Sequence, residues 1–175
     1  MPTKNLRNLL AQDDDKFELT KILFSLKDAE DYSIVLVGSS KLELAIRKAI
    51  EHSFKHKDGA LIKRMFDEPT APLSSLSAKN SLAFAMGLYD QKTYKDIETI
   101  RNIRNSFAHL NSVLKIEQNE IANLIKNLNV TKVHFTSETI EEHPAKHFFL
   151  LAISKLGNGV IAPLIWSQPE NLESN

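Results

Sequence analysis

Apolar side chains recur every third or fourth residue along most of this sequence, which is the spacing of one face of an α-helix. Only five glycines and six prolines interrupt the 175 residues. Residues 131–136 differ, because they alternate between polar and apolar in the manner of a short strand or extended arm. The pattern predicts an all-α helical bundle with a short irregular or strand-like segment near residues 130–143.

The helical pattern divides into consecutive segments. The first covers residues 16–27, and its apolar stripe consists of Leu19, Ile22, Leu23 and Leu26. Further helices are predicted over residues 32–55, 60–67, 75–88, 92–111, 117–128 and 145–156, the last of them ending at Gly157-Asn158-Gly159. Ile34–Val37 alone would also fit a buried strand, but the helical spacing continues beyond it. We expect a single domain over residues 1–166 and a disordered polar tail over residues 167–175.

The charge and composition of the chain exclude several classes of function. Twenty-two basic and 22 acidic residues give a formal net charge of zero, which argues against broad non-specific binding to nucleic acid. Cysteine is absent, so disulfides, thiolate metal sites and thiol nucleophiles are excluded. The chain starts with polar residues rather than a signal sequence, and its apolar runs are shorter than the roughly 20 residues of a membrane span. These features predict a soluble cytoplasmic protein without a membrane partner.

One segment, Ile100–Leu110, gathers side chains that suit a phosphate group. On a helix, Arg101, Asn105 and His109 share one stripe. Arg104 flanks this stripe. Arginine binds phosphate oxygens in a bidentate manner, and histidine exchanges protons near neutral pH. Strand cleavage by a ribose 2′-hydroxyl needs only such acid–base help and charge stabilisation, so the segment is a candidate site for RNA chemistry without a metal.

A structural role explains the same residues. Arginine and asparagine on a bundle helix often cap neighbouring helices or pair with buried carboxylates, and Glu43 is an available partner. A histidine near the C-terminal end of a helix also interacts favourably with the helix dipole. Spacing alone favours this structural interpretation, and burial of Arg104 against Glu43 within one subunit would support it.

Four stretches of the chain resemble the mannitol operon repressor family. They are Ile34–Glu43, Ala71–Lys79, Leu82–Leu88 and Ile100–His109, which in order and spacing cover about residues 16–127. Within the last stretch, Arg104-Asn105-Ser106-Phe107-Ala108-His109 also matches the R-N-x-x-x-H motif of the HEPN superfamily of helical nucleotide-binding and ribonuclease domains. The family resemblance implies an all-helical fold and a role in transcriptional regulation. The segment after Asn129 lies outside it.

The HEPN motif implies a role for each of its polar residues. By that resemblance, Arg104 holds a scissile phosphate, His109 assists proton transfer and Asn105 positions them. Sites of this kind are usually composed across a two-fold axis, so the resemblance also predicts a homodimer. It implies no cofactor and no metal. The same motif occurs in non-catalytic members, so a nucleotide- or RNA-binding module without turnover stays open.

A basic region offers a second candidate surface. Residues 41–64 carry seven basic and three acidic side chains. Arg47 and Lys48, together with Arg101, could follow the phosphate backbone of an RNA. A solvated helix face accounts for the same pattern.

Two pairs of histidines have the i, i+4 spacing of metal ligands. They are His52 with His56, and His143 with His147. Neither pair contains the glutamate of a metalloprotease motif. Solvated surface histidines explain both pairs, and no metal site is predicted.

The sequence supports two leading functions. The first is a transcriptional regulator that acts mainly through protein contacts, because no segment fits a helix-turn-helix with a basic recognition helix and specific DNA binding is therefore disfavoured. The second is a metal-independent endoribonuclease of the HEPN kind, in a toxin or defence setting, that uses Arg104 and His109. The RNA-binding module without turnover is the third.

Overall fold

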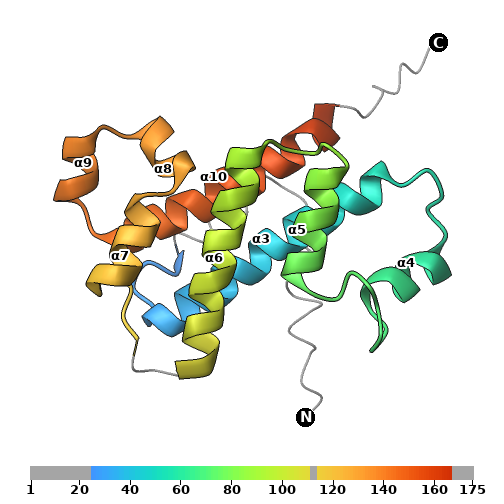
Figure 1. Cartoon of the computed structure of the whole chain (residues 1–175), viewed down its shortest axis with the longest axis horizontal. Coiled ribbons are helices and arrows are strands. Elements are labelled where there is room, and N and C mark those ends of the chain that lie inside the picture. The colour runs from blue at the N-terminus through green and yellow to red at the C-terminus, as the bar shows by residue number, and fades with distance from the viewer. Residues whose placement is uncertain (1–24, 111–113, 167–175) are drawn as a thin grey trace.

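The computed structural model describes residues 25–110 and 114–166, and within these ranges all regular structure is helical, which confirms the predicted fold class (Figure 1). The helices are α3 (Asp31–Ser53), α4 (Gly59–Phe66), α5 (Leu76–Ala85), α6 (Gln91–Leu110), α7 (Asn119–Lys126), α8 (Asn129–His134), α9 (Ser137–Glu142) and α10 (Ala145–Trp166). None of these helices is both long enough and apolar enough to cross a membrane. Most of the predicted first helix and the whole tail after residue 166 lie outside the described residues.

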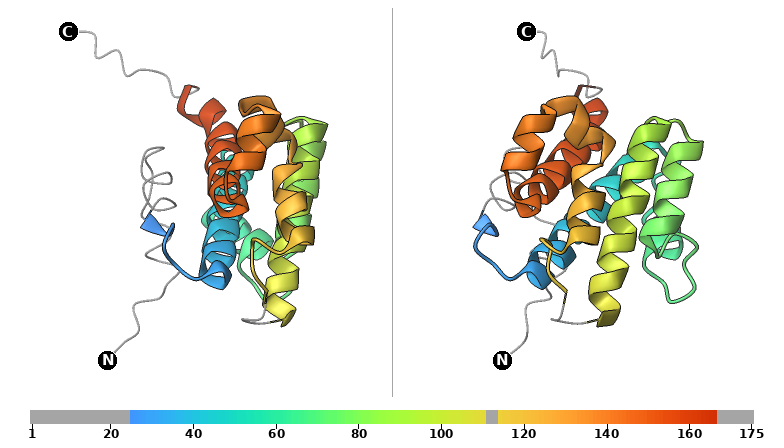
Figure 2. Two further views of the ribbon diagram at one scale, coloured as in Figure 1. Left: turned by 90° about the vertical axis from the view of Figure 1, so that its left-hand side faces the viewer. Right: turned by 60° about the vertical axis from the view of Figure 1, so that its left-hand side comes forward.

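The helices pack around α3. Helices α3 and α10 form the most extensive pair, and α5 and α6 also pack against α3. Figure 1 shows α6 crossing in front of α3 and α10, and Figure 2 shows α5 and α6 side by side. The core between these helices contains the predicted apolar stripes, among them Leu42, Ile46 and Ile50 of α3, Ile97, Ile100 and Phe107 of α6, and Phe149 and Ile153 of α10.

Helix α10 is longer than the sequence predicts. The expected end at Gly157-Asn158-Gly159 is wrong, because the helix continues through both glycines to Trp166. The reason is burial: Ile153, Leu156 and Val160 keep the helical spacing across the triplet, and all three lie in the core. Burying these side chains stabilises the helix by more than the roughly 1 kcal/mol that each glycine costs relative to alanine.

The segment near residues 130–143 folds as two short helices, α8 and α9, so the strand-like conformation predicted for residues 131–136 is wrong. Asp96 of α6 explains the difference. Its carboxylate accepts hydrogen bonds from the backbone N–H groups of Asn129 (2.9 Å) and Val130 (2.8 Å) and from Nδ2 of Asn129 (2.9 Å). The first turn of a helix leaves such N–H groups free. A carboxylate 33 residues away therefore starts α8, and no local pattern reveals it.

The first turn of α10 is tied to two other segments. The Glu117 carboxylate accepts hydrogen bonds from the backbone N–H groups of Ala145 (3.0 Å) and Lys146 (2.9 Å). The ammonium group of Lys146 lies 2.9 Å from Oδ1 of Asp31 and 3.3 Å from the backbone oxygen of Ala29. These contacts fix the start of α10 against the residues that precede α3 and its first turn.

Candidate functional site

Arg104 on α6 is held by a carboxylate of the same chain. Its Nη1 atom donates to Oε2 of Glu43 on α3 at 2.9 Å. The other carboxylate oxygen accepts a hydrogen bond from Nζ of Lys79 on α5 at 2.6 Å. Glu43 thus joins three helices, and the exposed fractions of the side chains are 31% for Arg104, 18% for Glu43 and 6% for Lys79. This is the intramolecular pairing with Glu43 that the structural interpretation predicts, and it leaves the cluster with one positive charge in excess.

Arg101 belongs to a second polar cluster on the same helix. Its Nε atom donates to Glu98 at 3.0 Å, and the other oxygen of Glu98 accepts from Nδ2 of Asn80 at 2.9 Å. The hydroxyl of Tyr89 donates to Oδ1 of Asn80 at 2.6 Å. Burial raises the pKa of the Tyr89 phenol well above its ordinary range, so the hydroxyl remains a neutral donor. These bonds tie Arg101, through Glu98, to α5.

Asn105 and His109 are the motif residues that face solvent. Both side chains are exposed on α6, and His109 lies in the last turn of the helix. Neither side chain makes a hydrogen bond or an ion pair in the part of the chain that the structure describes. The motif is therefore divided: one member is engaged by Glu43, and the other two are open to solvent.

Arg47 has its own partners at the far end of α3. Its guanidinium donates to both carboxylate oxygens of Asp67, at 2.6 and 2.9 Å, and to Glu51 at 2.6 Å. It also lies 4.8 Å from the centroid of the Phe66 ring. The hydrogen bond with Asp67 raises the pKa of Arg47 further above its already high value. Arg47 therefore holds the end of α4 against α3, while its neighbour Lys48 is half-buried on α3.

The structure does not turn the histidine pairs into a metal centre. Within residues 25–110 and 114–166, no group of three or more histidine, aspartate or glutamate side chains could hold a metal ion. His143 and His147 are exposed, with their ring centroids 6.5 Å apart. Both border the groove described next.

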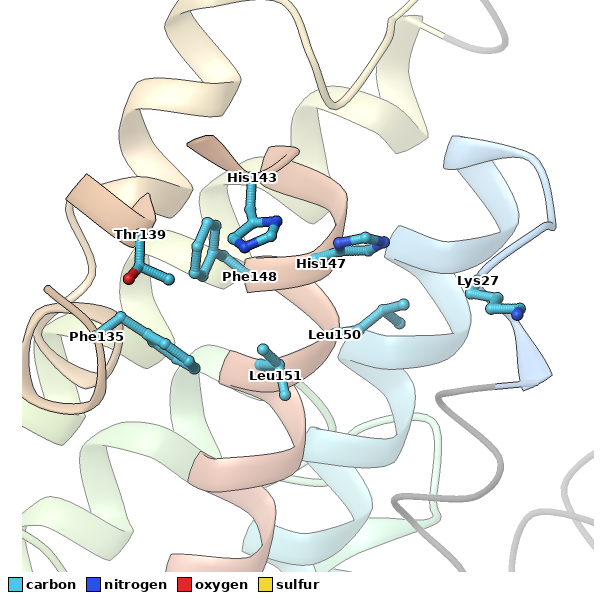
Figure 3. Close-up of a pocket in the computed structure, with 8 residues that line it drawn as sticks. All are labelled: Lys27, Phe135, Thr139, His143, His147, Phe148, Leu150 and Leu151. Atoms are coloured by element: carbon cyan, nitrogen blue, oxygen red, sulfur yellow. The ribbon is translucent and has the colours of Figure 1, made fainter. Parts of the chain in front are cut away.

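An apolar groove lies beside the first turns of α10, and we name it the α10 groove (Figure 3). Its cavity has a volume of about 270 Å³. It is lined by Lys27, Phe135, Thr139, His143, His147, Phe148, Leu150 and Leu151. Figure 3 shows Phe135 and Thr139 on one side of α10 and Lys27 on the other. Carbon atoms form nearly all of the lining surface, so the groove suits an apolar group.

Sequence reasoning missed Lys79, Asn80 and the groove. One signal could have revealed Lys79: it is the only charged residue among the ten residues of α5. If such a helix is packed inside the bundle, its single cation needs a carboxylate partner. The groove has no such signal, because its walls come from α10, the segment 135–143 and residues before α3.

These observations define an all-helical bundle in which the arginines of the predicted phosphate site hold carboxylates of their own chain. A family model described as "Mannitol repressor" (MtlR) matches residues 18–160. The chain therefore belongs to the mannitol repressor family. The match extends past Asn129, where the resemblance of the four stretches ends, so α8, α9 and most of α10 are part of the family domain.

Solved structures that share this fold include the following two. A chain in the X-ray structure of the MtlR–HPr complex from Escherichia coli is 15% identical with a TM-score of 0.66, and the alignment covers 83% of this chain and 97% of that one. A possible transcriptional regulator, YggD, from Shigella flexneri 2a is 16% identical with a TM-score of 0.64, covering 81% and 96% of the two chains. No curated protein sequence matches the chain.

Proposed function

We propose that this protein is a cytoplasmic transcriptional regulator that acts by binding another protein. Membership of the mannitol repressor family supports the regulatory role. The structure of the Escherichia coli MtlR–HPr complex supports a protein partner, because a chain of the same fold takes part in that complex. We take HPr, or a protein like it, as the first partner to test.

The ion pairs of three arginines are the observation that favours a protein partner over a nucleic acid. Arg47, Arg101 and Arg104 each hold a carboxylate of their own chain. Binding to nucleic acid is driven by cations that neutralise phosphates and release counterions. A phosphate would have to compete with these carboxylates for each arginine, in a chain whose net charge is zero. The predicted RNA surface of Arg47, Lys48 and Arg101 is therefore disfavoured as a phosphate-binding site.

Apolar side chains on the surface suit a protein partner. Four large ones are exposed within the described residues: Phe84, Met86, Leu124 and Val133, which is 71% exposed. Phe84 packs against Tyr94 with ring centroids 4.8 Å apart, which restricts its side chain. Fixed aromatic and methionine side chains are enriched in protein interfaces.

The test compares a protein with a DNA ligand under one set of conditions. Purified full-length chain is titrated with Escherichia coli HPr by calorimetry at about 150 mM salt, where non-specific phosphate contacts are weakened. In parallel, the DNA upstream of its own gene is tested by gel shift against unrelated DNA of the same length. We expect saturable heat with HPr and no preference between the two DNAs. Absence of heat with HPr overturns the choice of partner, and a preference of at least about 10³-fold for the upstream DNA overturns the mechanism.

A second candidate, a homodimeric HEPN-type endoribonuclease, is favoured by one observation. Asn105 and His109 are exposed one helical turn apart, as the motif requires. This candidate function predicts that the protein cleaves RNA in the presence of EDTA and leaves a 2′,3′-cyclic phosphate. Both Arg104→Ala and His109→Ala should abolish the cleavage. Lys95→Ala, on the same helix, is the control and should retain it. Binding of RNA without cleavage would indicate the module without turnover, and a monomer in sedimentation would exclude a site shared between two chains.

A further inference from the structure

We infer that the α10 groove is the docking site for the apolar stripe of residues 19–23 of the same chain. The occupant is therefore internal, and the stripe consists of Leu19, Ile22 and Leu23. Docked in this way, the groove becomes part of the core of the domain. The inference is independent of the proposed regulatory function.

The size and lining of the groove fit side chains better than a free small molecule. Its volume of about 270 Å³ lies just below the roughly 300–1,000 Å³ of ligand pockets. Ligand pockets also place a few polar groups to orient their ligand, whereas this lining is almost wholly apolar. Aliphatic side chains need only the apolar surface that Phe135, Phe148 and Leu151 supply.

The chain enters the described structure at the edge of the groove. Lys27 lines the cavity, and its neighbour Leu26 packs against the core. The segment is anchored there, because the backbone N–H of Ala29 donates to the carbonyl of Leu26 at 2.9 Å and Lys146 at the start of α10 holds Ala29 and Asp31. Whatever precedes Ser25 therefore starts beside the α10 groove.

The sequence before Ser25 has apolar residues at helical spacing, which is the pattern that suits a segment beside an apolar groove. Leu19, Ile22 and Leu23 precede Leu26 by seven, four and three residues, so on a helix all of them share one face. Ser25 is helical and residues 26–28 form a turn, so a helix over the stripe would end at the edge of the groove and can turn its apolar face toward it. Such a helix from Ser25 back to Leu19 covers only about 9 Å at 1.5 Å per residue, so the stripe starts close to the groove. The family match begins at residue 18 and so includes the stripe.

Charge also favours this occupant. The ionisable side chains of the groove, Lys27, His143 and His147, are all basic, and no carboxylate lines it. The segment that leads into the stripe carries Asp13, Asp14 and Asp15. With a lysine and no carboxylate in the lining, the aspartates meet no like charge near the rim of the groove, and Lys27 attracts them.

A cross-linking experiment tests the inference in the full-length chain. Because the natural chain has no cysteine, the double variant Leu23→Cys/Leu151→Cys carries the only two thiols. The matched control is Lys21→Cys/Leu151→Cys, since Lys21 lies on the opposite side of the same predicted helix. With a short bis-maleimide, we expect the first pair to form a cross-link within one chain at least about fivefold faster, because docking raises the local thiol concentration. Equal rates overturn the inference, and cross-links mainly between two chains overturn it in favour of a second copy.

A measurement without thiols guards against failure of the double variant to fold. Ile22→Asp removes apolar character from the stripe, and Lys21→Asp introduces the same charge on its opposite face. We expect Ile22→Asp to raise the fluorescence of an apolar-surface dye severalfold, with no rise for Lys21→Asp, while circular dichroism shows the helical content of both unchanged. Equal dye binding by the two variants contradicts the inference. Neither outcome depends on HPr, so the docking inference can fail while the proposed function stands.

Discussion

The two ends of α6 are attached to the rest of the molecule by different means. Near the C-terminal end, the Arg104 guanidinium meets the carboxylate of Glu43, which also holds the buried ammonium group of Lys79. Near the N-terminal end, the carboxylate of Asp96 is 3% exposed and accepts its hydrogen bonds from neutral N–H groups of Asn129 and Val130. One end relies on charge pairs and the other on amide donors.

The difference determines what happens when a carboxylate is lost. Removing one member of a buried charge pair leaves an uncompensated charge in a poorly hydrated place. Removing the acceptor of neutral donors leaves only unpaired N–H groups, which cost less. The end of α6 that carries the Arg104 motif is therefore expected to be the more sensitive one. Arg104, whose spacing suits catalysis, therefore also has a structural role through Glu43.

The largest effect is expected for Glu43→Ala. It leaves Lys79, only 6% exposed, without its carboxylate, and should lower the free energy of unfolding by about 3 kcal/mol. For a chain of this length that is a fall in Tm of roughly 10 °C, measured by circular dichroism. Adding Lys79→Met removes the stranded charge and should restore at least about 1 kcal/mol. A loss in Glu43→Ala below about 1 kcal/mol would contradict the role assigned to this pair.

A smaller loss is expected for Asp96→Ala. The variant leaves the N–H groups at the start of α8 without an acceptor, and we expect a loss of about 2 kcal/mol in urea unfolding. Asp90→Ala is the matched control, because Asp90 also accepts a backbone N–H, that of Thr93 at 2.9 Å, but does so in full exposure to solvent. If the control lost as much stability as Asp96→Ala, burial would not be the reason for the sensitivity of Asp96.

Tyr89 gives the clusters around α6 a dependence on pH. Because its pKa is raised by burial, the phenol stays protonated in the folded protein, whereas tyrosine in the unfolded chain ionises near pH 10. Its contribution to stability is therefore present below about pH 10 and is lost as the pH rises further. We expect the stability difference between wild type and Tyr89→Phe to shrink above that pH by about 1 kcal/mol per pH unit, measured by urea unfolding between about pH 8 and 11. A constant difference over this range would show that Tyr89 is not desolvated.

The fold could be predicted from the sequence as far as it rests on local spacing. Ile97, Ile100 and Phe107 recur at helical intervals, and all three are fully buried. The same rule failed where tertiary contacts override a local signal. The glycines of α10 predict the end of a helix. The helix continues past them because Ile153, Leu156 and Val160 are buried in the core.

The candidate site could be predicted only in part, because its pairs join distant residues. Glu43 is 61 residues from Arg104 and 36 from Lys79. A carboxylate partner for Arg104 could be proposed, since arginine on a bundle helix usually has one. For Lys79 the sequence offers only its position as the single charged residue of α5, because lysine is typical of surfaces and its burial depends on how α5 packs against α3.

The smallest effects separate the members of the motif from one another. Arg104→Ala removes one of the two cations on Glu43, and since its side chain is 31% exposed, solvent screening limits the loss to about 1 kcal/mol. His109→Ala and Asn105→Ala remove exposed side chains and should change the stability by less than about 0.5 kcal/mol. Unfolding in urea measures all three under the same conditions. A loss in His109→Ala as large as that in Arg104→Ala would mean that the imidazole has a structural partner, and the division of the motif into one engaged and two open residues would be wrong.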